Sequence, residues 1–182
     1  MSERKAALVT GSTSGIGLGI ATAFAKAGMD VTLNGLGDAA EIEKIRAGLE
    51  REAGVTVRYD GANLMQAEGC ASLVEGAIGA FGRLDVLVNN AGIQHVSPIE
   101  DFPVEKYNAI IALNLSSAFL TIRSAMKAMK GAKYGRIINI ASAHGHVASP
   151  FKSDYVADKH GNIGLTKHVE LEGATFKVRC HA

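Results

Sequence analysis

Short apolar segments alternate with longer segments of helical period along nearly the whole chain, and this alternation restricts the fold more than any other feature of the sequence. The short, strand-like segments lie at residues 6–10, 30–34, 55–59, 84–89, 136–141 and 176–180. The longer, helix-like segments lie at residues 16–28, 39–53, 65–81, 104–130 and 154–172. Strands and helices that alternate in this way form βαβ units. The sequence therefore predicts an α/β fold, a doubly wound parallel sheet in one domain over residues 1–182.

The charge balance argues against several classes of function. The sequence holds 19 Lys and Arg against 18 Asp and Glu, so we expect no nucleic-acid partner and no polybasic membrane anchor. No stretch near the N-terminus is apolar enough for a signal peptide, and no apolar run of membrane-spanning length follows it. Cys70 and Cys180 lie far apart and outside any metal-ligand spacing. A reduced, soluble, cytoplasmic protein without a membrane partner is the simplest interpretation.

A glycine-rich segment, Thr10 to Gly17, follows the first strand-like segment and leads directly into a helix-like one. Phosphate groups bind to free backbone N–H donors at a helix N-terminus, and glycines let a ligand approach that backbone closely. Glycines also serve ordinary turns, so the spacing alone leaves a plain turn open. The position between a strand and a helix of an α/β chain favours a dinucleotide-binding loop.

The charges near this loop favour NAD over NADP. The 2′-phosphate of NADP binds Arg or Lys, whereas the free hydroxyl of NAD needs a neutral or acidic neighbour. Residues 11–17 and 34–40 contain no Arg or Lys, and the nearest charge is that of Asp38. Asp38 and Glu41 have the spacing of a capping box, so we expect Asp38 to cap a helix rather than to bind the ribose.

Tyr155 and Lys159 lie four residues apart in a helix-like segment and therefore share one face of it. This spacing is common enough to arise by chance. Ser142 strengthens the pattern because it follows a strand-like segment at the carboxyl edge of the expected sheet, where ligands bind. A free tyrosine has a pKa of about 10, and a lysine ammonium one turn away favours the phenolate. The residue types therefore suit a base that takes the hydroxyl proton of an alcohol.

The glycine spacing, the run 89–92 and the ordered series Asn114, Ser142, Tyr155 and Lys159 together resemble the short-chain dehydrogenase/reductase family. The resemblance implies a Rossmann-like fold in which Tyr155 is the general base and Lys159 binds the nicotinamide ribose. It implies that Ser142 holds the substrate oxygen and that Asn114 holds a relay water. For Asn114, a locally paired polar residue inside a helix is the alternative.

The resemblance also implies which residues contact NAD. They belong to the glycine loop, to the segments that follow the next strands and to the catalytic helix: Gly11, Thr13, Ser14, Gly15, Ile16, Gly17, Leu36, Asn63, Leu64, Asn90, Ala91, Gly92, Tyr155 and Lys159. For the run 89–92, a type I′ turn is the alternative. Asn63 stands where the family usually has an Asp that bonds the adenine amine. It keeps an acceptor but loses the charge, so we expect weaker NAD binding.

Several stretches, including NNAGIQH, GRIINIASAHG and KSDYVADKHG, resemble bacterial members of the family that oxidise D-3-hydroxybutyrate to acetoacetate. This resemblance implies a small hydroxy-acid substrate held by Gln94, His144 and Lys152, beside Ser142 and Tyr155. Lys152 and His144 suit a carboxylate because they donate charge-assisted hydrogen bonds, although both are also ordinary loop residues. His144 and His146 lack a third ligand at a suitable spacing, so we expect no metal site.

Besides Asn63, two features depart from the family pattern. Asp154 and Asp158 bracket Tyr155, although the residue before the lysine is usually small, and Asp158 can pair with Lys159 or His160. The sequence also stops at Ala182, whereas family members are longer, so we expect a fragment or a C-terminally truncated protein. A 3-oxoacyl reductase, a sugar dehydrogenase and a non-catalytic dinucleotide-binding module remain open as alternatives.

Assembly follows from the same resemblance. In the family, the helices that match residues 104–130 and 154–172 pack against a second subunit. Here the first of them carries an apolar row: Ile111, Leu115, Phe119, Ile122 and Met126. Burial against the chain's own sheet is the alternative, because one helix face can make only one of the two contacts. We expect a homo-oligomer, either a dimer or a tetramer.

Overall fold

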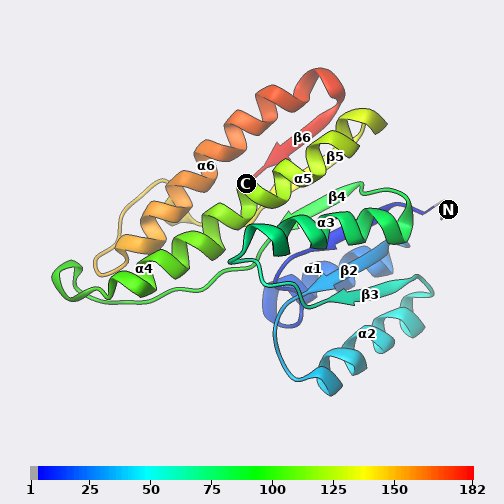
Figure 1. Ribbon diagram of the computed structural model, residues 1–182, viewed down its shortest axis with the longest axis horizontal. Helices are drawn as coiled ribbons and strands as arrows, with labels where there is room; N and C mark the ends of the chain where they lie inside the picture. Colours follow the sequence, from blue (N-terminus) through cyan, green and yellow to red (C-terminus); the bar gives the residue numbers. More distant parts are fainter. Residues whose placement is uncertain (1–3) are drawn as a thin grey trace.

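Six parallel strands form one sheet in the computed structural model, which describes residues 4–182 (Figure 1). The strands are β1 (Ala6–Val9), β2 (Asp30–Asn34), β3 (Val57–Asp60), β4 (Val86–Asn89), β5 (Gly135–Asn139) and β6 (Val178–His181). Their order in the sheet is β3-β2-β1-β4-β5-β6, so the direction of winding reverses between β1 and β4. This is the strand order of the Rossmann fold, and the predicted doubly wound α/β fold is confirmed.

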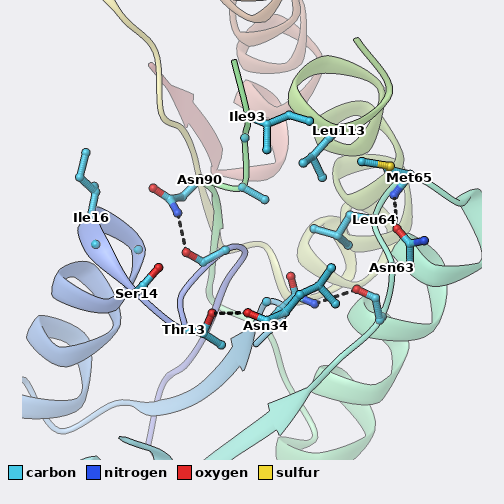
Figure 2. Close-up of a pocket in the computed structure, with 18 residues that line it drawn as sticks. Thr13, Ser14, Ile16, Asn34, Asn63, Leu64, Met65, Asn90, Ile93 and Leu113 are labelled. Atoms are coloured by element: carbon cyan, nitrogen blue, oxygen red, sulfur yellow. Dashed lines mark hydrogen bonds between the residues drawn. The ribbon is translucent and has the colours of Figure 1, made fainter. Parts of the chain in front are cut away.

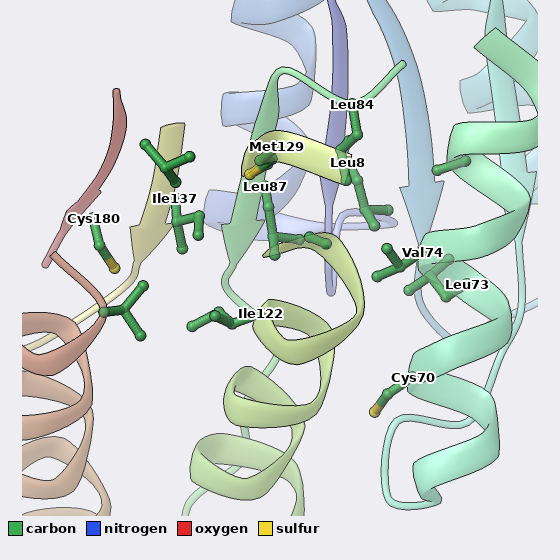
Figure 3. Close-up of a cluster of buried hydrophobic side chains, with 14 of the residues drawn as sticks. Leu8, Cys70, Leu73, Val74, Leu84, Leu87, Ile122, Met129, Ile137 and Cys180 are labelled. Atoms are coloured by element: carbon green, nitrogen blue, oxygen red, sulfur yellow. The ribbon is translucent and has the colours of Figure 1, made fainter. Parts of the chain in front are cut away.

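Helices cover both faces of the sheet. They are α1 (Gly15–Lys26), α2 (Ala39–Ala53), α3 (Ala67–Phe81), α4 (Val104–Ile111), α5 (Ser117–Ala132) and α6 (Ser153–Gly173). Successive side chains of a strand point to opposite faces, and β1 shows this directly. Leu8 packs into one core with α3, α5 and α6, whereas Ala7 and Val9 pack into another with α1 and α2. Figure 3 shows the first core, in which Leu8, Leu87 and Ile137 of the sheet lie among side chains of α3 and α5, such as Leu73 and Ile122.

The predicted segments match these elements closely. The bounds of β2 and α2 coincide with the predicted 30–34 and 39–53, and Asp38 caps α2 by accepting hydrogen bonds from two backbone N–H groups. The third strand begins later than predicted, at Val57, and the prediction of residues 55–59 was wrong by two residues. Gly54, in the left-handed conformation, ends α2, and the next two residues carry the chain into the sheet. There the Thr56 N–H donates to Asp30 Oδ1 at 2.9 Å.

The predicted helix over 104–130 is not a single α-helix. A π-helical segment, Ala112–Ser116, separates α4 from α5 without breaking the continuous run of helix. A π turn inserts one extra residue into the hydrogen-bond ladder, and such turns often lie at functional sites. Asn114 is at its centre and is buried. No Gly or Pro marks this segment in the sequence, so the interruption has no local signal.

The run of helix from Val104 to Ala132 has the length and apolar composition that a membrane span would need. It lies instead along the sheet, next to α6 (Figure 1). Its inner face, including Ala118, Ile122 and Met129, packs into the core beneath β4 and β5. This packing is that of a core helix.

A chain of four polar side chains ties α5 and α6 to the middle of the sheet. Thr121 Oγ1 donates to Asn89 Oδ1 at 2.7 Å, and Asn89 Nδ2 donates to Asn139 Oδ1 at 2.9 Å. Asn139 Nδ2 then donates to Thr166 Oγ1 at 2.8 Å. Each of the four is connected to the next, so this buried polar network is satisfied rather than costly. It fixes the positions of α5 and α6 along β4 and β5, near the ends of these strands.

Candidate active site and dinucleotide cleft

The glycine loop leaves the end of β1, next to β4, where the winding of the sheet reverses. Open α/β sheets bind ligands at this point. Gly11 has a φ of 60°, and a Cβ at this residue would lie 2.8 Å from the Cα of Ala91. A Cβ at Gly17 would overlap the carbonyl oxygen of Gly11. Only glycine fits these two positions, which gives the spacing a physical reason beyond an ordinary turn. Helix α1 begins at Gly15, within this glycine-rich segment, and its N-terminus lies at the cleft.

A cleft of about 570 Å³ lies beside the loop (Figure 2). The structure brings together in its wall every NAD contact predicted from the loop and from the segments after the strands: Gly11, Thr13, Ser14, Gly15, Ile16, Gly17, Leu36, Asn63, Leu64, Asn90, Ala91 and Gly92. The cleft has further lining residues that the sequence did not indicate: Asn34, Gly35, Ala62, Met65, Ile93 and Leu113. Of these, Asn34 could have been predicted from the sequence, because it is the last residue of β2 and lies at the ligand-binding edge of the sheet.

The run 89–92 braces the glycine loop. Asn90 Nδ2 donates to the carbonyl oxygens of Thr10 and Gly11, both at 2.9 Å. In return, Thr10 Oγ1 accepts from the backbone N–H groups of Asn90 and Ala91, at 2.9 and 3.0 Å. A type I′ turn requires positive φ at its two central residues, and no residue of this run has one. The alternative of a type I′ turn is therefore wrong for this run.

Asn63 lies in the wall of the cleft, but its oxygen is already used. Asn63 Oδ1 accepts from the Met65 N–H at 3.0 Å, so the acceptor that was expected for the adenine amine has a partner within the chain. Near the Leu36 edge of the cleft, Asp38 Oδ1 accepts from the N–H groups of Ala40 and Glu41 at 3.0 Å. The cleft has no Arg or Lys among its lining residues.

Tyr155 and Lys159 lie one turn apart on α6, close to its N-terminus. Lys159 Nζ is 5.3 Å from the centre of the Tyr155 ring and donates to the Ile140 carbonyl at 2.7 Å. The Lys159 side chain is 12 % exposed, so its ammonium acts in a largely desolvated setting.

Ser142 and His144 complete this group. Strand β5 ends at Asn139, so Ser142 is not the end of the strand but caps the 3-10 turn Ala143–Gly145. Ser142 Oγ lies 3.3 Å from His144 Nδ1 and accepts from the His144 N–H at 3.2 Å. The His144 ring meets the Tyr155 ring edge to face, with centres 5.7 Å apart. Three of the predicted site residues are therefore together: Ser142, His144 and Tyr155.

Gln94 and Lys152 lie on two segments that run side by side. The backbone N–H of Ser97 donates to the Phe151 carbonyl at 3.0 Å, which joins the stretch after β4 to the stretch before α6. Gln94 is exposed and Lys152 is half-buried. In the part of the chain that the structure describes, neither side chain is hydrogen-bonded to Ser142 or Tyr155. Their predicted role is not tested by these contacts.

Asn114 is hydrogen-bonded to the stretch after β4 and to α6. Its Oδ1 accepts from the Ile93 N–H, and its Nδ2 donates to the Ile93 carbonyl, each at 2.9 Å. The second N–H of the amide donates to Asp158 Oδ2 at 2.6 Å. The Asn114 carbonyl accepts from Asn162 Nδ2 at 3.0 Å. The side chain is paired, but with residues distant in the sequence rather than locally, and its relay role stays a prediction.

Asp154 and Asp158 are both completely buried. Asp158 Oδ1 lies 3.9 Å from Lys159 Nζ, so the expected pairing with the lysine exists at the outer limit of an ion pair. His160 is exposed and faces the Val156 carbonyl instead. Burial raises the pKa of Asp158 to about 6; the bond from Asn114 and the charge of Lys159 oppose that rise, and Asp154 adds to it. Over residues 4–182, no group of three His, Cys, Asp or Glu side chains is placed to hold a metal ion.

A sequence profile described as short chain dehydrogenase matches residues 5–182. The chain belongs to the short-chain dehydrogenase family. The predicted family and the predicted class of oxidoreductase are thereby confirmed. The crystal structure of a protein described as a putative short-chain alcohol dehydrogenase, from Sinorhizobium meliloti 1021, superposes with a TM-score of 0.91 at 34% identity. The superposition covers 99% of this chain and 70% of the other.

Two relatives within the short-chain dehydrogenase family carry a more specific name. D-beta-hydroxybutyrate dehydrogenase of Cupriavidus necator is 53% identical over all of this chain. D-beta-hydroxybutyrate dehydrogenase of Rhizobium meliloti is 54% identical over 93% of it. The chain spans 70% and 66% of the lengths of these relatives, which agrees with the expectation that family members are longer.

Proposed function

We propose that the chain oxidises D-3-hydroxybutyrate to acetoacetate, with NAD in the cleft and Tyr155 as the general base. One observation supports this most strongly: Lys159 Nζ lies 5.3 Å from the Tyr155 ring, with Ser142 and His144 beside that ring. The residues of the cleft suit a dinucleotide, since Gly11 and Gly17 permit the close backbone contacts that shape the loop at the N-terminus of α1. The loop and the N-terminus of α1 would hold the pyrophosphate. Bound NAD would supply the hydride acceptor.

The chain's own residues account for the rest of the chemistry. Oxidation of a secondary alcohol needs a group that accepts the hydroxyl proton, and a tyrosine with an ordinary pKa of about 10 is a poor base near neutrality. The Lys159 ammonium favours the phenolate and so makes Tyr155 a better base. Ser142 would donate a hydrogen bond to the substrate oxygen and orient it.

The choice of NAD over NADP rests on charge. An additional phosphate on the adenosine ribose would need a basic side chain, and the lining of the cleft contains none. Asp38 lies near the same edge and would repel a phosphate, although its own role is to cap α2.

The choice of a small hydroxy acid rests on His144, Lys152 and Gln94, and on the names of the two relatives. His144 already contacts Tyr155, and Lys152 directly precedes the first residue of α6. A histidine and a lysine beside the reacting hydroxyl suit a carboxylate, because both donate charge-assisted hydrogen bonds.

Initial rates on this chain test the proposal. We expect turnover of D-3-hydroxybutyrate with NAD, a rate at least about tenfold lower with NADP, and no reduction of a long 3-oxoacyl thioester by NADPH. We also expect Lys152→Ala to raise the KM for hydroxybutyrate at least tenfold, about 1.4 kcal/mol, because a charge-assisted bond is lost. Lys167→Ala, at an exposed lysine of α6, is the matched control and leaves KM unchanged.

Other outcomes would change the proposal in defined ways. Faster turnover of the acyl thioester would assign a 3-oxoacyl reductase. NAD binding in a calorimeter without turnover of any hydroxy acid would assign a non-catalytic dinucleotide-binding module.

We also propose that the chain is cytoplasmic and forms a dimer. Both thiols are unpaired and buried, and burial raises the pKa of Cys70 to about 11, as suits a reduced protein.

On α5, Ile122 is buried in the chain's own core, as the alternative interpretation of its apolar row required. Phe119 from the same row is 51% exposed beside Leu165 of α6. Sedimentation at micromolar concentration tests the assembly, and a monomer there would contradict it.

A further inference from the structure

The buried face of α6 carries a row of polar side chains. Asp154, Asp158, Asn162 and Thr166 recur every fourth residue and are all buried. Thr166 bonds to Asn139, and Asn162 bonds to the Asn114 carbonyl. The two carboxyl groups have fewer hydrogen-bond partners. Both oxygens of Asp154 and one oxygen of Asp158 are buried without a hydrogen-bond partner. Such groups are costly in a core, so their presence beside the reacting residues calls for a physical account.

Asp158 lies between Asn114 and Lys159. Its Oδ2 takes the second N–H of Asn114 at 2.6 Å, and its Oδ1 lies 3.9 Å from Lys159 Nζ. The ammonium in turn lies 5.3 Å from the Tyr155 ring. Lys159 therefore lies next to both Asp158 and Tyr155, and the carboxylate can act on the tyrosine through the charge of the lysine.

The charged groups that face Asp158 can be named element by element. Helix α6 itself supplies Asp154 and Lys159, the two charges that act on this carboxyl group. The π segment supplies only the amide of Asn114. The buried residues of α4 and α5 carry no charge. They are Ile110 on α4 and Ser117, Ala118, Thr121, Ile122, Ala125 and Met129 on α5. The 3-10 turn supplies His144, whose ring contacts Tyr155.

We propose that Asp158 is a positioning residue of the Tyr155–Lys159 pair, offsetting the ammonium charge of Lys159 and fastening the π segment to α6 through Asn114. The proposal rests on the proposed function only in taking Tyr155 as the base. When Asp158 is neutral, the lysine acts on Tyr155 without opposition, and the phenolate is favoured. When Asp158 is ionised, part of that positive field is cancelled, and Tyr155 keeps its proton to higher pH.

The expected range of this effect follows from burial. Because burial raises the pKa of Asp158 to about 6, its charge changes close to neutral pH rather than in acid. Removal of the carboxylate should thus matter most above pH 6, where the carboxylate of the unmodified chain is ionised.

The ionisation of Tyr155 can be followed directly, without cofactor or substrate. The increase in tyrosinate absorbance with pH is recorded for the chain and for Tyr155→Phe, and the difference gives the Tyr155 midpoint. In the Asp158→Asn background we expect this midpoint to fall by about one pH unit, the size of a Coulomb effect at a partly desolvated site. Glu172→Gln removes a charge from an exposed position of the same helix and should leave the midpoint in place.

An unchanged Tyr155 midpoint in Asp158→Asn would overturn the proposal. The titration is repeated with Asp158→Ala, which also removes the charge, so that poor folding of one variant does not decide the result. A merely structural role would change unfolding but would not move the tyrosine midpoint. Because no NAD or hydroxy acid is present, the titration can fail while turnover succeeds, and the reverse. The two proposals are therefore tested separately.

Discussion

Tyr155→Phe is expected to lower kcat for D-3-hydroxybutyrate by about a thousandfold, roughly 4 kcal/mol of transition-state stabilisation, while the Kd for NAD changes less than about threefold. The substitution removes only the hydroxyl group. The ring remains to contact His144 and Lys159, so the packing around the N-terminus of α6 is kept. The loss should appear in kcat rather than in KM, because proton acceptance is needed in the transition state and not for binding.

Steady-state rates and calorimetry with NAD check this expectation together. Tyr134→Phe is the matched control: it removes a hydroxyl that accepts from Lys5 Nζ, on a tyrosine that directly precedes β5, at the end of the strand opposite to the site. It should leave both kcat and NAD binding unchanged. Full activity in Tyr155→Phe would remove Tyr155 from the chemistry, and with it the main support for the proposed function.

Asp158→Asn is expected to raise the free energy of unfolding at pH 8 by about 3 kcal/mol. Burial raises the pKa of Asp158 from 3.8 to about 6 in the folded chain. Between these values the folded state holds a proton that the unfolded state has released. The stabilising contribution of the neutral acid is therefore complete below about pH 4 and is lost as the pH rises through 6. Asparagine has a similar shape, keeps an acceptor for Asn114 and carries no charge.

Urea unfolding at several pH values measures this effect. The chain should lose stability between about pH 4 and pH 7, and Asp158→Asn should lose much less over the same range. Glu105→Gln, which removes an exposed carboxyl group from α4, should retain the pH dependence of the unmodified chain. Equal pH profiles for the chain and Asp158→Asn would mean that the buried carboxyl group costs nothing when it ionises.

Much of the fold could be predicted because its signals are local. The bounds of β2 and α2 follow from a run of apolar residues and from a capping residue, Asp38, that lie within a few positions of each element. The same is true of the glycine loop. Gly11 and Gly17 are required by close backbone contacts, and that requirement can be read from the spacing once a strand and a helix are placed on either side.

The parts that escaped prediction depend on partners distant in the sequence. The π segment is held by Asn114, which accepts from Ile93 N–H and Asn162 Nδ2 and donates to Asp158. None of these partners is its neighbour along the chain. Leu113 reaches the cleft from that same segment. The period of an apolar row also fails to say which of its members meets the chain's own sheet, and here Ile122 does so while Phe119 does not.

The polar chain from Thr121 through Asn89 and Asn139 to Thr166 has a mechanical meaning for the site. It clamps α5 about two turns from Asn114, and it clamps α6 about three turns from Tyr155. Because Thr121 of α5 and Thr166 of α6 are bonded to neighbouring strands of one sheet, the two helices keep a fixed position relative to each other. The separation of Asn114 and Tyr155 across the site is thereby set from the middle of the sheet.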